Sequence, residues 1–331
     1  MNTEGFYHQP VLLKETLAAL KLSAKGLYVD GTVGGAGHAK AMLQAAPGIR
    51  LIGLDKDETA LTVATARLAP FGERVQIYHS SFAQMKQALS ALGWSETPLS
   101  GVLLDIGVSS PQLDTAKRGF SYMQDGPLDM RMDAKKPEAR DQRIEGDRSS
   151  SCSLTAADIV NGWEEKEIAR ILWEYGEERW AKRIAAFIVA ERAIVPIETT
   201  LQLVGVIKKA VPKGAREAGQ HPAKRSFMAL RIAVNDELEE LRQGLDAAQK
   251  LLKTGGRLVV ISFHSLEDRI VKDKFNNWAR GCICPPELPV CVCGHRPEMK
   301  IVTRRPIMAG VEEIAQNPRA RSAKLRVAEK L

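Results

Sequence analysis

The stretch Leu27-Tyr28-Val29-Asp30-Gly31-Thr32-Val33-Gly34-Gly35-Ala36-Gly37-His38, residues 27–38, decides the fold of this chain. Its apolar start predicts a short strand that ends at Asp30. Glycines then follow at four of the next seven positions, and glycine lets a backbone turn tightly and approach a ligand closely. A helical pattern begins at His38. This order of strand, glycine-rich turn and helix predicts a βα unit with a ligand site at the carboxyl end of the strand.

The same alternation continues along the chain after this unit. Short apolar runs alternate with helical patterns of about ten to fifteen residues, which indicates βαβ units and a parallel sheet. The predicted strands are 27–29, 51–54, 75–78 and 102–106, and the predicted helices between them are 38–46, 58–68 and 82–92.

The alternation stops after residue 130 and resumes near residue 257. Residues 131–150 carry six Lys/Arg and five Asp/Glu with almost no apolar side chains, which predicts a solvated segment. The pattern is helical from 155 to 211, and one long helix is predicted over 226–252 before a buried strand at 257–263. We therefore expect a doubly wound, mostly parallel α/β domain made of 1–133 and 218–331, split by an all-helical domain at 134–217.

Composition sets the broad class of the protein. Hydrophobic residues make up 44% and charged residues 26% of the 331 residues, which is typical of a soluble globular protein and excludes a disordered or collagen-like chain. No apolar run approaches the roughly 18 residues of a membrane span. The N-terminal sequence MNTEGFYHQPVLLKETL lacks the features of a signal peptide, so a cytoplasmic location is expected. The sequence does not determine the oligomeric state.

Positive charge is concentrated in two segments. Residues 296–331 hold nine Lys/Arg against four Asp/Glu, and residues 208–225 hold six against one, in a chain of net charge +7. Such segments favour a polyanionic partner. Solvated surface Lys and Arg are the alternative explanation.

Acidic residues end three of the predicted strands. Asp30 precedes the glycine-rich turn, Asp55 ends the second strand and Asp105 lies at the end of the fourth. An acid at the position of Asp55 accepts hydrogen bonds from ribose hydroxyls in nicotinamide, flavin and S-adenosylmethionine proteins alike. The turn is not a clean G-x-G-x-x-G, and methyltransferases place a residue at the position of Asp105 between methyl donor and acceptor, so S-adenosylmethionine is favoured. Turn glycines and strand-end acids of an ordinary α/β fold are the alternative.

Longer motifs point to one family. The chain resembles the RsmH/MraW family of 16S rRNA (cytosine N4)-methyltransferases over nearly its whole length. The motifs that carry the resemblance are HQPVLL at 8–13, DGTVGGAGH at 30–38, LLDIGVSSPQLD at 103–114, RGFSYMQDGPLDMRMD at 118–133, YGEERWAKRI at 175–184, HPAKRSFMALRI at 221–232, VISFHSLEDRIVK at 260–272 and NPRARSAKLR at 317–326.

The resemblance implies a class I S-adenosylmethionine-dependent methyltransferase fold with an inserted helical substrate-recognition domain. It implies methylation of the N4 amine of a cytidine in the decoding region of 16S rRNA, position 1402 in the rRNA nomenclature used for that family, within the small ribosomal subunit. The cofactor contacts that it implies fall on Ala36, Gly37, His38, Asp55, Phe82, Asp105 and Gln112. The family has Gly-Gly-His where this chain has Ala36-Gly37-His38, and segment 134–150 is longer than usual.

The implied reaction needs no cysteine nucleophile, because the N4 amine itself attacks the methyl group. The site must align the amine, accept a hydrogen bond from it and take its proton. Asp105 is the candidate catalytic residue. His264 is either a second polar contact or a cap of the helix that starts at Ser265, and Phe120 and Tyr122 either stack on the base or pack under a loop.

Two other function classes stay open from the residues alone. A nicotinamide-dependent oxidoreductase shares the glycine-rich turn and Asp55, and a non-catalytic RNA-binding assembly factor shares the basic segments. No metal is assigned to the catalytic site. The pairs Cys282/Cys284 and Cys291/Cys293 predict a structural four-thiolate zinc site, with reduced free thiols as the alternative.

Overall fold

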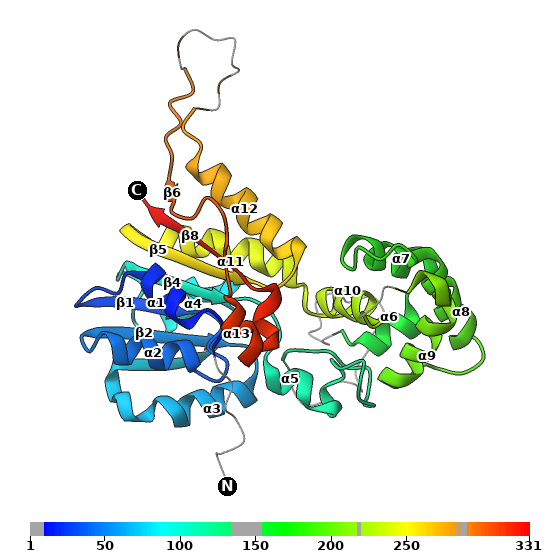
Figure 1. The fold of residues 1–331 in the computed structure, drawn as a ribbon. Coiled ribbons are helices and arrows are strands. Elements are labelled where there is room, and N and C mark those ends of the chain that lie inside the picture. Colours follow the sequence, from blue (N-terminus) through cyan, green and yellow to red (C-terminus); the bar gives the residue numbers. More distant parts are fainter. Residues whose placement is uncertain (1–9, 134–153, 217–219, 283, 285–289, 291) are drawn as a thin grey trace. The chain divides into compact units, whose positions relative to one another are not determined.

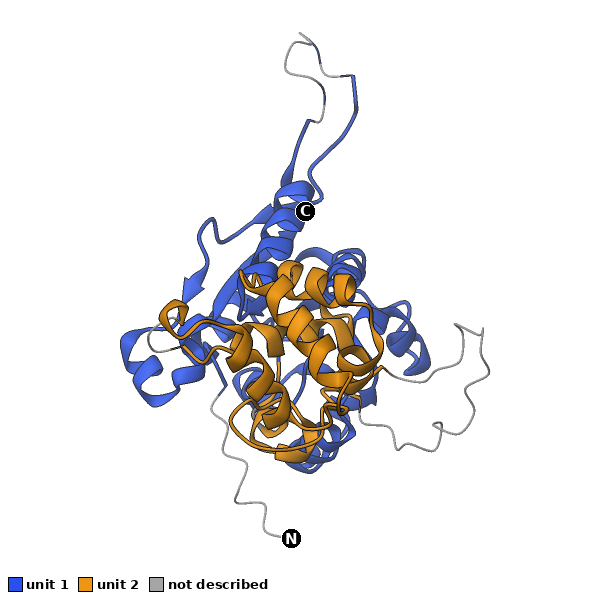
Figure 2. Ribbon diagram, turned by 90° about the vertical axis from the view of Figure 1, so that its right-hand side faces the viewer, with its two compact units in different colours: residues 1–107, 238–331 blue, residues 108–237 orange. Residues whose placement is uncertain are grey.

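The computed structural model describes residues 10–133, 154–216, 220–282, 284, 290 and 292–331. The chain forms two compact units, one made of residues 1–107 and 238–331 and the other of residues 108–237 (Figure 2). The second unit is wider than the expected insertion, because the expected boundaries at 134 and 217 both lie inside it. The charged segment 134–150 lies outside the described residues.

The first unit contains one mixed sheet (Figure 1). Its strand order is β3-β2-β1-β4-β5-β8-β6, and β7 pairs with β8. Strands β1 to β5 are parallel to one another, and β8 runs antiparallel to β5. The predicted doubly wound, mostly parallel α/β fold is therefore confirmed. The strands are β1 (Gly26–Asp30), β2 (Ile49–Asp55), β3 (Val75–His79), β4 (Leu99–Asp105), β5 (Leu252–Ser262), β6 (Met299–Ile301), β7 (Ile307–Met308) and β8 (Lys324–Lys330).

Helices cover both faces of this sheet. The core on one face is built with side chains from α1, α2 and α3, and the core on the other face with side chains from α4, α11 and α12. Central strand β4 is buried on both faces, which explains its nearly continuous apolar sequence. The helices are α1 (Leu13–Leu20), α2 (Gly37–Ala45), α3 (Glu58–Leu68), α4 (Met85–Ala91), α11 (Glu237–Leu251), α12 (Ser265–Ala279) and α13 (Val311–Gln316).

The basic segment 296–331 is largely part of the fold. It supplies β6, β7, α13 and β8, of which the sequence interpretation had predicted none. Arg326 on β8 is 8% exposed, and its guanidinium donates to the carboxylate of Asp268 on α12 at 2.6 Å. Some of the positive charge in this segment therefore serves folding, whereas Arg304, Arg305 and Arg321 are exposed.

The second unit is helical, as its sequence pattern predicts. Its helices enclose a separate apolar core that includes Ile159, Ile171, Ile184 and Phe227. The helices are α5 (Ser110–Asp114), α6 (Ala156–Gly162), α7 (Glu165–Glu174), α8 (Ala181–Arg192), α9 (Thr200–Ala210) and α10 (Lys224–Asn235).

The single long helix predicted over 226–252 is wrong. Helix α10 ends at Asn235, and Asp236 adopts a left-handed conformation with φ 49° before α11 begins at Glu237. The Asn235 amide donates to the carbonyl of Met130, and the Arg231 guanidinium pairs with Glu237 at 2.7 Å. These contacts stabilise a break that apolar periodicity alone does not reveal.

Among the described residues, none of the helices combines the length and the hydropathy that crossing a membrane requires.

Candidate functional site

The candidate site lies in the first unit, where β1, β2 and β4 end. Asp30, Asp55 and Asp105 are the last residues of these three parallel strands, so all three lie at the same edge of the sheet. In open α/β sheets this edge is where ligands bind.

The glycine-rich turn is tied to all three strand ends. The N–H of Gly31 donates to the carbonyl of Leu103 at 2.9 Å, and the N–H of Gly34 donates to Oδ2 of Asp55 at 2.8 Å. The N–H of Asp105 donates to the hydroxyl of Thr32 at 2.7 Å. Ala36 takes the left-handed conformation with φ 61°, and α2 begins directly after it. The turn is thus a fixed loop that presents the first N–H groups of α2 at this edge.

Two glycines of the turn are required by close packing. A Cβ on Gly31 would come within 2.5 Å of Leu104 and 2.9 Å of Phe82, and a Cβ on Gly37 would come within 2.4 Å of the Pro10 ring. Gly34, by contrast, has φ 47°, and a Cβ there would meet only the carbonyl oxygen of Thr32 at an ordinary contact distance of 3.8 Å. Close packing therefore explains why positions 31 and 37 hold glycine, and the left-handed backbone conformation explains why position 34 does.

Asp55 is half-buried and already accepts two backbone hydrogen bonds. Oδ2 receives the N–H of Gly34, and Oδ1 receives the N–H of Asp57 at 2.9 Å. Burial nevertheless raises the pKa of this carboxyl above its usual value. A carboxylate offers about four acceptor positions, so Asp55 retains acceptor capacity for a ligand beside the backbone groups that it already binds.

Asp105 is a buried acid with a raised pKa at this edge. Burial raises its pKa to about 8, and the charges of Asp30 and Glu267 add to the effect. Its Oδ1 is buried and has no hydrogen-bond partner in the structure, while the side chain as a whole keeps 24% of its surface exposed. A buried acceptor without a partner is costly to folding, and such an atom at the ligand edge of a sheet indicates a functional group.

Asp30 and His38 surround Asp105. Asp30 is 1% exposed, and burial raises its pKa to about 7 although the N–H of Thr32 donates to it. His38, in the first turn of α2, donates from Nε2 to the carbonyl of Val11 at 3.0 Å and places Nδ1 3.6 Å from Oδ2 of Asp105. The side chain of His38 therefore points toward Asp105 and the N-terminal segment, and its backbone N–H remains a candidate cofactor contact.

Two predicted cofactor residues lie in different surroundings. Phe82 is 9% exposed, and its ring packs so closely on Gly244 of α11 that a Cβ there would come within 2.3 Å. This ring is mainly a core side chain. Gln112 belongs to the second unit, is 4% exposed, and accepts a hydrogen bond from the N–H of Ser109 in the capping box of α5. Both cofactor roles stay predictions.

His264 caps α12, which is the structural alternative that the sequence left open. Its Nδ1 accepts from the N–H of Glu267 at 3.4 Å, and Glu267 accepts from the N–H of Phe263 and of His264. Glu267 is 1% exposed, and its negative charge contributes to the raised pKa of Asp105. The sequence interpretation missed Glu267, although its spacing of three residues from the cap is the signature of a capping box.

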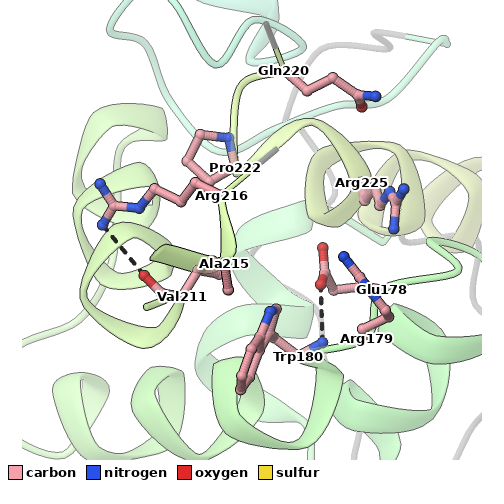
Figure 3. A pocket seen from close by; sticks show the side chains of 9 residues that line it. All are labelled: Glu178, Arg179, Trp180, Val211, Ala215, Arg216, Gln220, Pro222 and Arg225. Atoms are coloured by element: carbon pink, nitrogen blue, oxygen red, sulfur yellow. Dashed lines mark hydrogen bonds between the residues drawn. The ribbon is translucent and has the colours of Figure 1, made fainter. Parts of the chain in front are cut away.

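The second unit carries a pocket that is lined by several charged side chains. A shallow pocket of about 40 Å³ is lined by Arg179, Arg216 and Arg225 together with Trp180 and Glu178 (Figure 3). The remaining lining residues are Val211, Ala215, Gln220 and Pro222.

The aromatic side chains predicted to stack on a base differ in exposure. Phe120 is 5% exposed in the core of the second unit, so the packing alternative applies to it. Tyr122 is half-buried and stacks on His221, with ring centroids 4.8 Å apart, and it meets Phe227 edge-on.

Comparison with known proteins identifies the family. The family model described as the MraW methylase family matches residues 5–331. This chain belongs to that family. It is 57% identical to a protein of Geobacter sp. over 329 residues, covering 99% of this chain and 100% of that protein. It is 54% identical to one of Symbiobacterium thermophilum over 328 residues, covering 99% and 98%. Both relatives are named ribosomal RNA small subunit methyltransferase H.

Similarity to a solved structure is weaker than similarity to these relatives. An rRNA methylase from Streptococcus thermophilus covers 99% of each chain with a TM-score of 0.40 and 9% identity, which is too low for a comparison of residues. Family membership confirms the resemblance that the motifs indicated, and it leaves the nicotinamide alternative and the non-catalytic alternative without support.

Proposed function

We propose that this methylase transfers a methyl group from S-adenosylmethionine to the N4 amine of a cytidine in the decoding region of small-subunit rRNA. The family and the names of its relatives support rRNA methylation with this methyl donor. The N4 amine and the decoding region come from the resemblance stated above. A protein with this function works in the cytoplasm, where small ribosomal subunits are assembled.

The observation that carries the proposal is the unpartnered, buried Oδ1 of Asp105 at the carboxyl end of β4. A carboxyl whose pKa lies near 8 is well matched to accept a proton near neutral pH, because catalytic efficiency is greatest when the pKa of a general base is close to the working pH. The residue therefore suits a reaction in which an amine must lose a proton.

The turn and the strand ends fit the cofactor. Asp55 would hold the ribose hydroxyls through its remaining acceptor positions. The N–H groups of Gly37 and His38 lie in the first turn of α2, where the partial positive charge of a helix is found. Ala36 keeps its N–H although it replaces a glycine, but that N–H donates to the carbonyl of Val33 at 2.7 Å. We therefore assign the loop contacts mainly to Gly37 and His38.

S-adenosylmethionine supplies an electrophilic methyl group carried on a positively charged sulfur. Asp105 would orient the cytosine amine by accepting a hydrogen bond from one of its N–H groups, and a nearby positive charge would favour the ionised carboxylate. After attack by the amine nitrogen, Asp105 would take the proton that the amine loses. Burial, together with the charges of Asp30 and Glu267, keeps the pKa of Asp105 high enough for this step.

RNA binding is assigned to both units. The helical unit, centred on the predicted domain 134–217, would act in substrate recognition through its arginine-lined pocket and the exposed Lys208 and Lys209. Exposed arginines in the first unit, Arg304, Arg305 and Arg321, would contact phosphates. Tyr122 remains the candidate for stacking on an unpaired base.

The test is methyl transfer to isolated small ribosomal subunits with labelled S-adenosylmethionine, followed by digestion to nucleosides and mass analysis. We expect one labelled product, N4-methylcytidine, from a single position. Label on carbon 5, on a ribose hydroxyl or on another base would contradict the proposal. Naked rRNA serves as the comparison that shows whether the assembled subunit is the substrate.

A further inference from the structure

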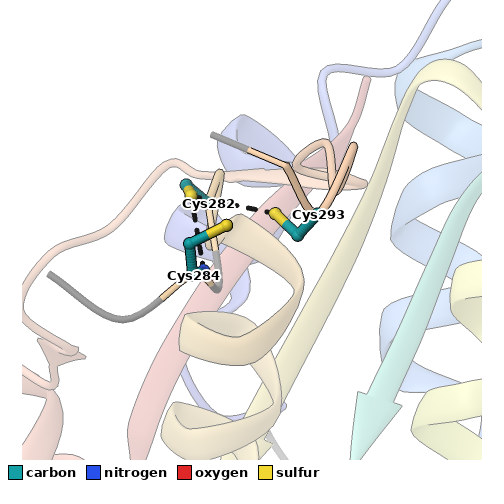
Figure 4. A group of neighbouring side chains, drawn as sticks. All are labelled: Cys282, Cys284 and Cys293. Atoms are coloured by element: carbon teal, nitrogen blue, oxygen red, sulfur yellow. Dashed lines mark hydrogen bonds between the residues drawn. The ribbon is translucent and has the colours of Figure 1, made fainter. Parts of the chain in front are cut away.

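Three cysteines gather beside the end of α12, in a part of the first unit that the proposed reaction does not use (Figure 4). Cys282 and Cys284 follow the helix, and Cys293 lies on the chain as it returns toward β6. All three are outside disulfides, and their sulfur atoms lie within 4.8 Å of one another. The fourth cysteine of the predicted site, Cys291, lies outside the described residues.

The spacing of the sulfurs matches a tetrahedral metal site. Sγ of Cys282 and Sγ of Cys293 are 3.7 Å apart. Two thiolates bound to one zinc ion at about 2.3 Å with tetrahedral angles stand about 3.8 Å apart. A disulfide would require about 2.05 Å, so the observed pair has the separation of two metal ligands.

Backbone groups already support the sulfurs. The N–H of Cys284 points at Sγ of Cys282 at 3.4 Å, and the N–H of Val292 points at Sγ of Cys284 at 3.4 Å. Hydrogen bonds of this kind stabilise thiolate ligands and fix their orientation. The Nδ1 of His295 donates to the carbonyl of Gly281 at 2.9 Å, which joins the two ends of the loop beside the cysteines.

We propose that Cys282, Cys284 and Cys293 bind one zinc ion. Soft thiolates in a tetrahedral arrangement select zinc over hard cations such as Mg²⁺ or Ca²⁺. The cluster supplies three of the four ligands of a tetrahedral site, and the variants below identify the fourth. A site closed by four protein ligands has no open position for chemistry, so the ion holds together the connection between α12 and β6.

The first experiment measures metal in the full-length protein, purified without a histidine tag or chelator. Elemental analysis is expected to give about one equivalent of zinc per chain. Replacing zinc with Co²⁺ should give the visible absorption of tetrahedral cobalt with a thiolate charge-transfer band. Less than half an equivalent of zinc, with these thiols reacting freely under native conditions, would overturn the proposal. Iron in place of zinc would overturn it as well.

Variants then assign the ligands. Cys282→Ser together with Cys284→Ser should reduce the bound zinc to less than a tenth of an equivalent, while the control Cys152→Ser should keep the full equivalent. Separate Cys291→Ser and His295→Ala variants identify the fourth ligand by which one loses zinc. A Cys282–Cys293 disulfide found by mass spectrometry in protein purified under reducing conditions would contradict the site. If a variant fails to fold, the zinc content and the cobalt spectrum of the unmodified protein still decide whether the site binds metal.

Discussion

Replacing Asp105 with asparagine should make the ligand-free protein more stable at high pH while it slows methyl transfer at least about a hundredfold. The pKa of Asp105 rises from 3.8 to about 8 on folding, chiefly through burial. A raised carboxyl pKa means that the folded state binds the proton more tightly than the unfolded state does, so protonation stabilises the fold. That contribution is complete below about pH 4 and is lost as the pH rises through about 8. Asparagine has no charge to bury at any pH.

The size of the effect follows from the shift. Each pKa unit corresponds to about 1.4 kcal/mol. Between pH 5 and pH 9 the unfolding free energy falls only until the pH reaches the folded-state pKa near 8. These roughly three units set an upper limit of about 4 kcal/mol on the change in unfolding free energy. The side chain keeps 24% of its surface exposed, and relaxation with water entry lowers such penalties. We therefore expect the stability advantage of Asp105→Asn over the unmodified protein to grow by about 2 kcal/mol over this range.

Urea unfolding at pH 5, 7 and 9 measures this difference without ligand. Asp273→Asn is the matched control, because Asp273 lies on α12 of the same unit and its side chain is 59% exposed. The control should show no growth in stability relative to the unmodified protein. A constant difference between Asp105→Asn and the unmodified protein at all three pH values would refute the argument that Asp105 is a buried acid kept at a cost to folding.

Three further predictions concern the cofactor loop and the RNA surface. Asp55→Ala should weaken S-adenosylmethionine binding about tenfold or more, measured by calorimetry, because a charged hydrogen bond contributes on the order of 1.5–3 kcal/mol; unchanged affinity in a folded variant removes Asp55 from the site. Gly37→Ala should lower the unfolding free energy by about 1–3 kcal/mol, since its Cβ would meet Pro10 at 2.4 Å, whereas Gly35→Ala has 3.7 Å to its nearest neighbour and should be nearly neutral. Arg319→Ala with Arg321→Ala should reduce the salt dependence of RNA affinity by up to about two phosphate equivalents; an unchanged slope with a lower melting temperature would make both arginines structural.

The central sheet could be predicted because its strands are buried on both faces. A continuous apolar run such as Val102-Leu103-Leu104 predicts a parallel strand that is buried on both faces. Strand β8 was missed because Lys324, Arg326 and Lys330 gave its segment the composition of a solvated basic tail. The Arg326–Asp268 pair, which neutralises the buried charge, joins residues far apart in the sequence. The alternation of Leu325 and Val327 with charged residues was the available signal.

The site was predictable as a set of strand-end residues, but their environments were not. The positions of Asp55 and Asp105 followed from the βα pattern and the motifs. The burial of Asp30, the approach of His38 to Asp105 and the influence of Glu267 depend on packing between distant segments. Phe82 could not be recognised as a core side chain, since its partner Gly244 lies on α11.

The most direct test of the central claim is the pH dependence of kcat/KM for methyl transfer to small ribosomal subunits. This parameter reports the pKa of the essential base in the free enzyme. For the unmodified protein we expect kcat/KM to rise with pH, to reach half of its maximum near pH 8, where half of the Asp105 carboxyl is ionised, and to level off above that pH. For Asp105→Asn we expect a loss of at least about a hundredfold and no rise of this kind. An Asp105→Asn protein with the unmodified rate and the same pH profile would contradict the assignment of Asp105 as the group that takes the amine proton.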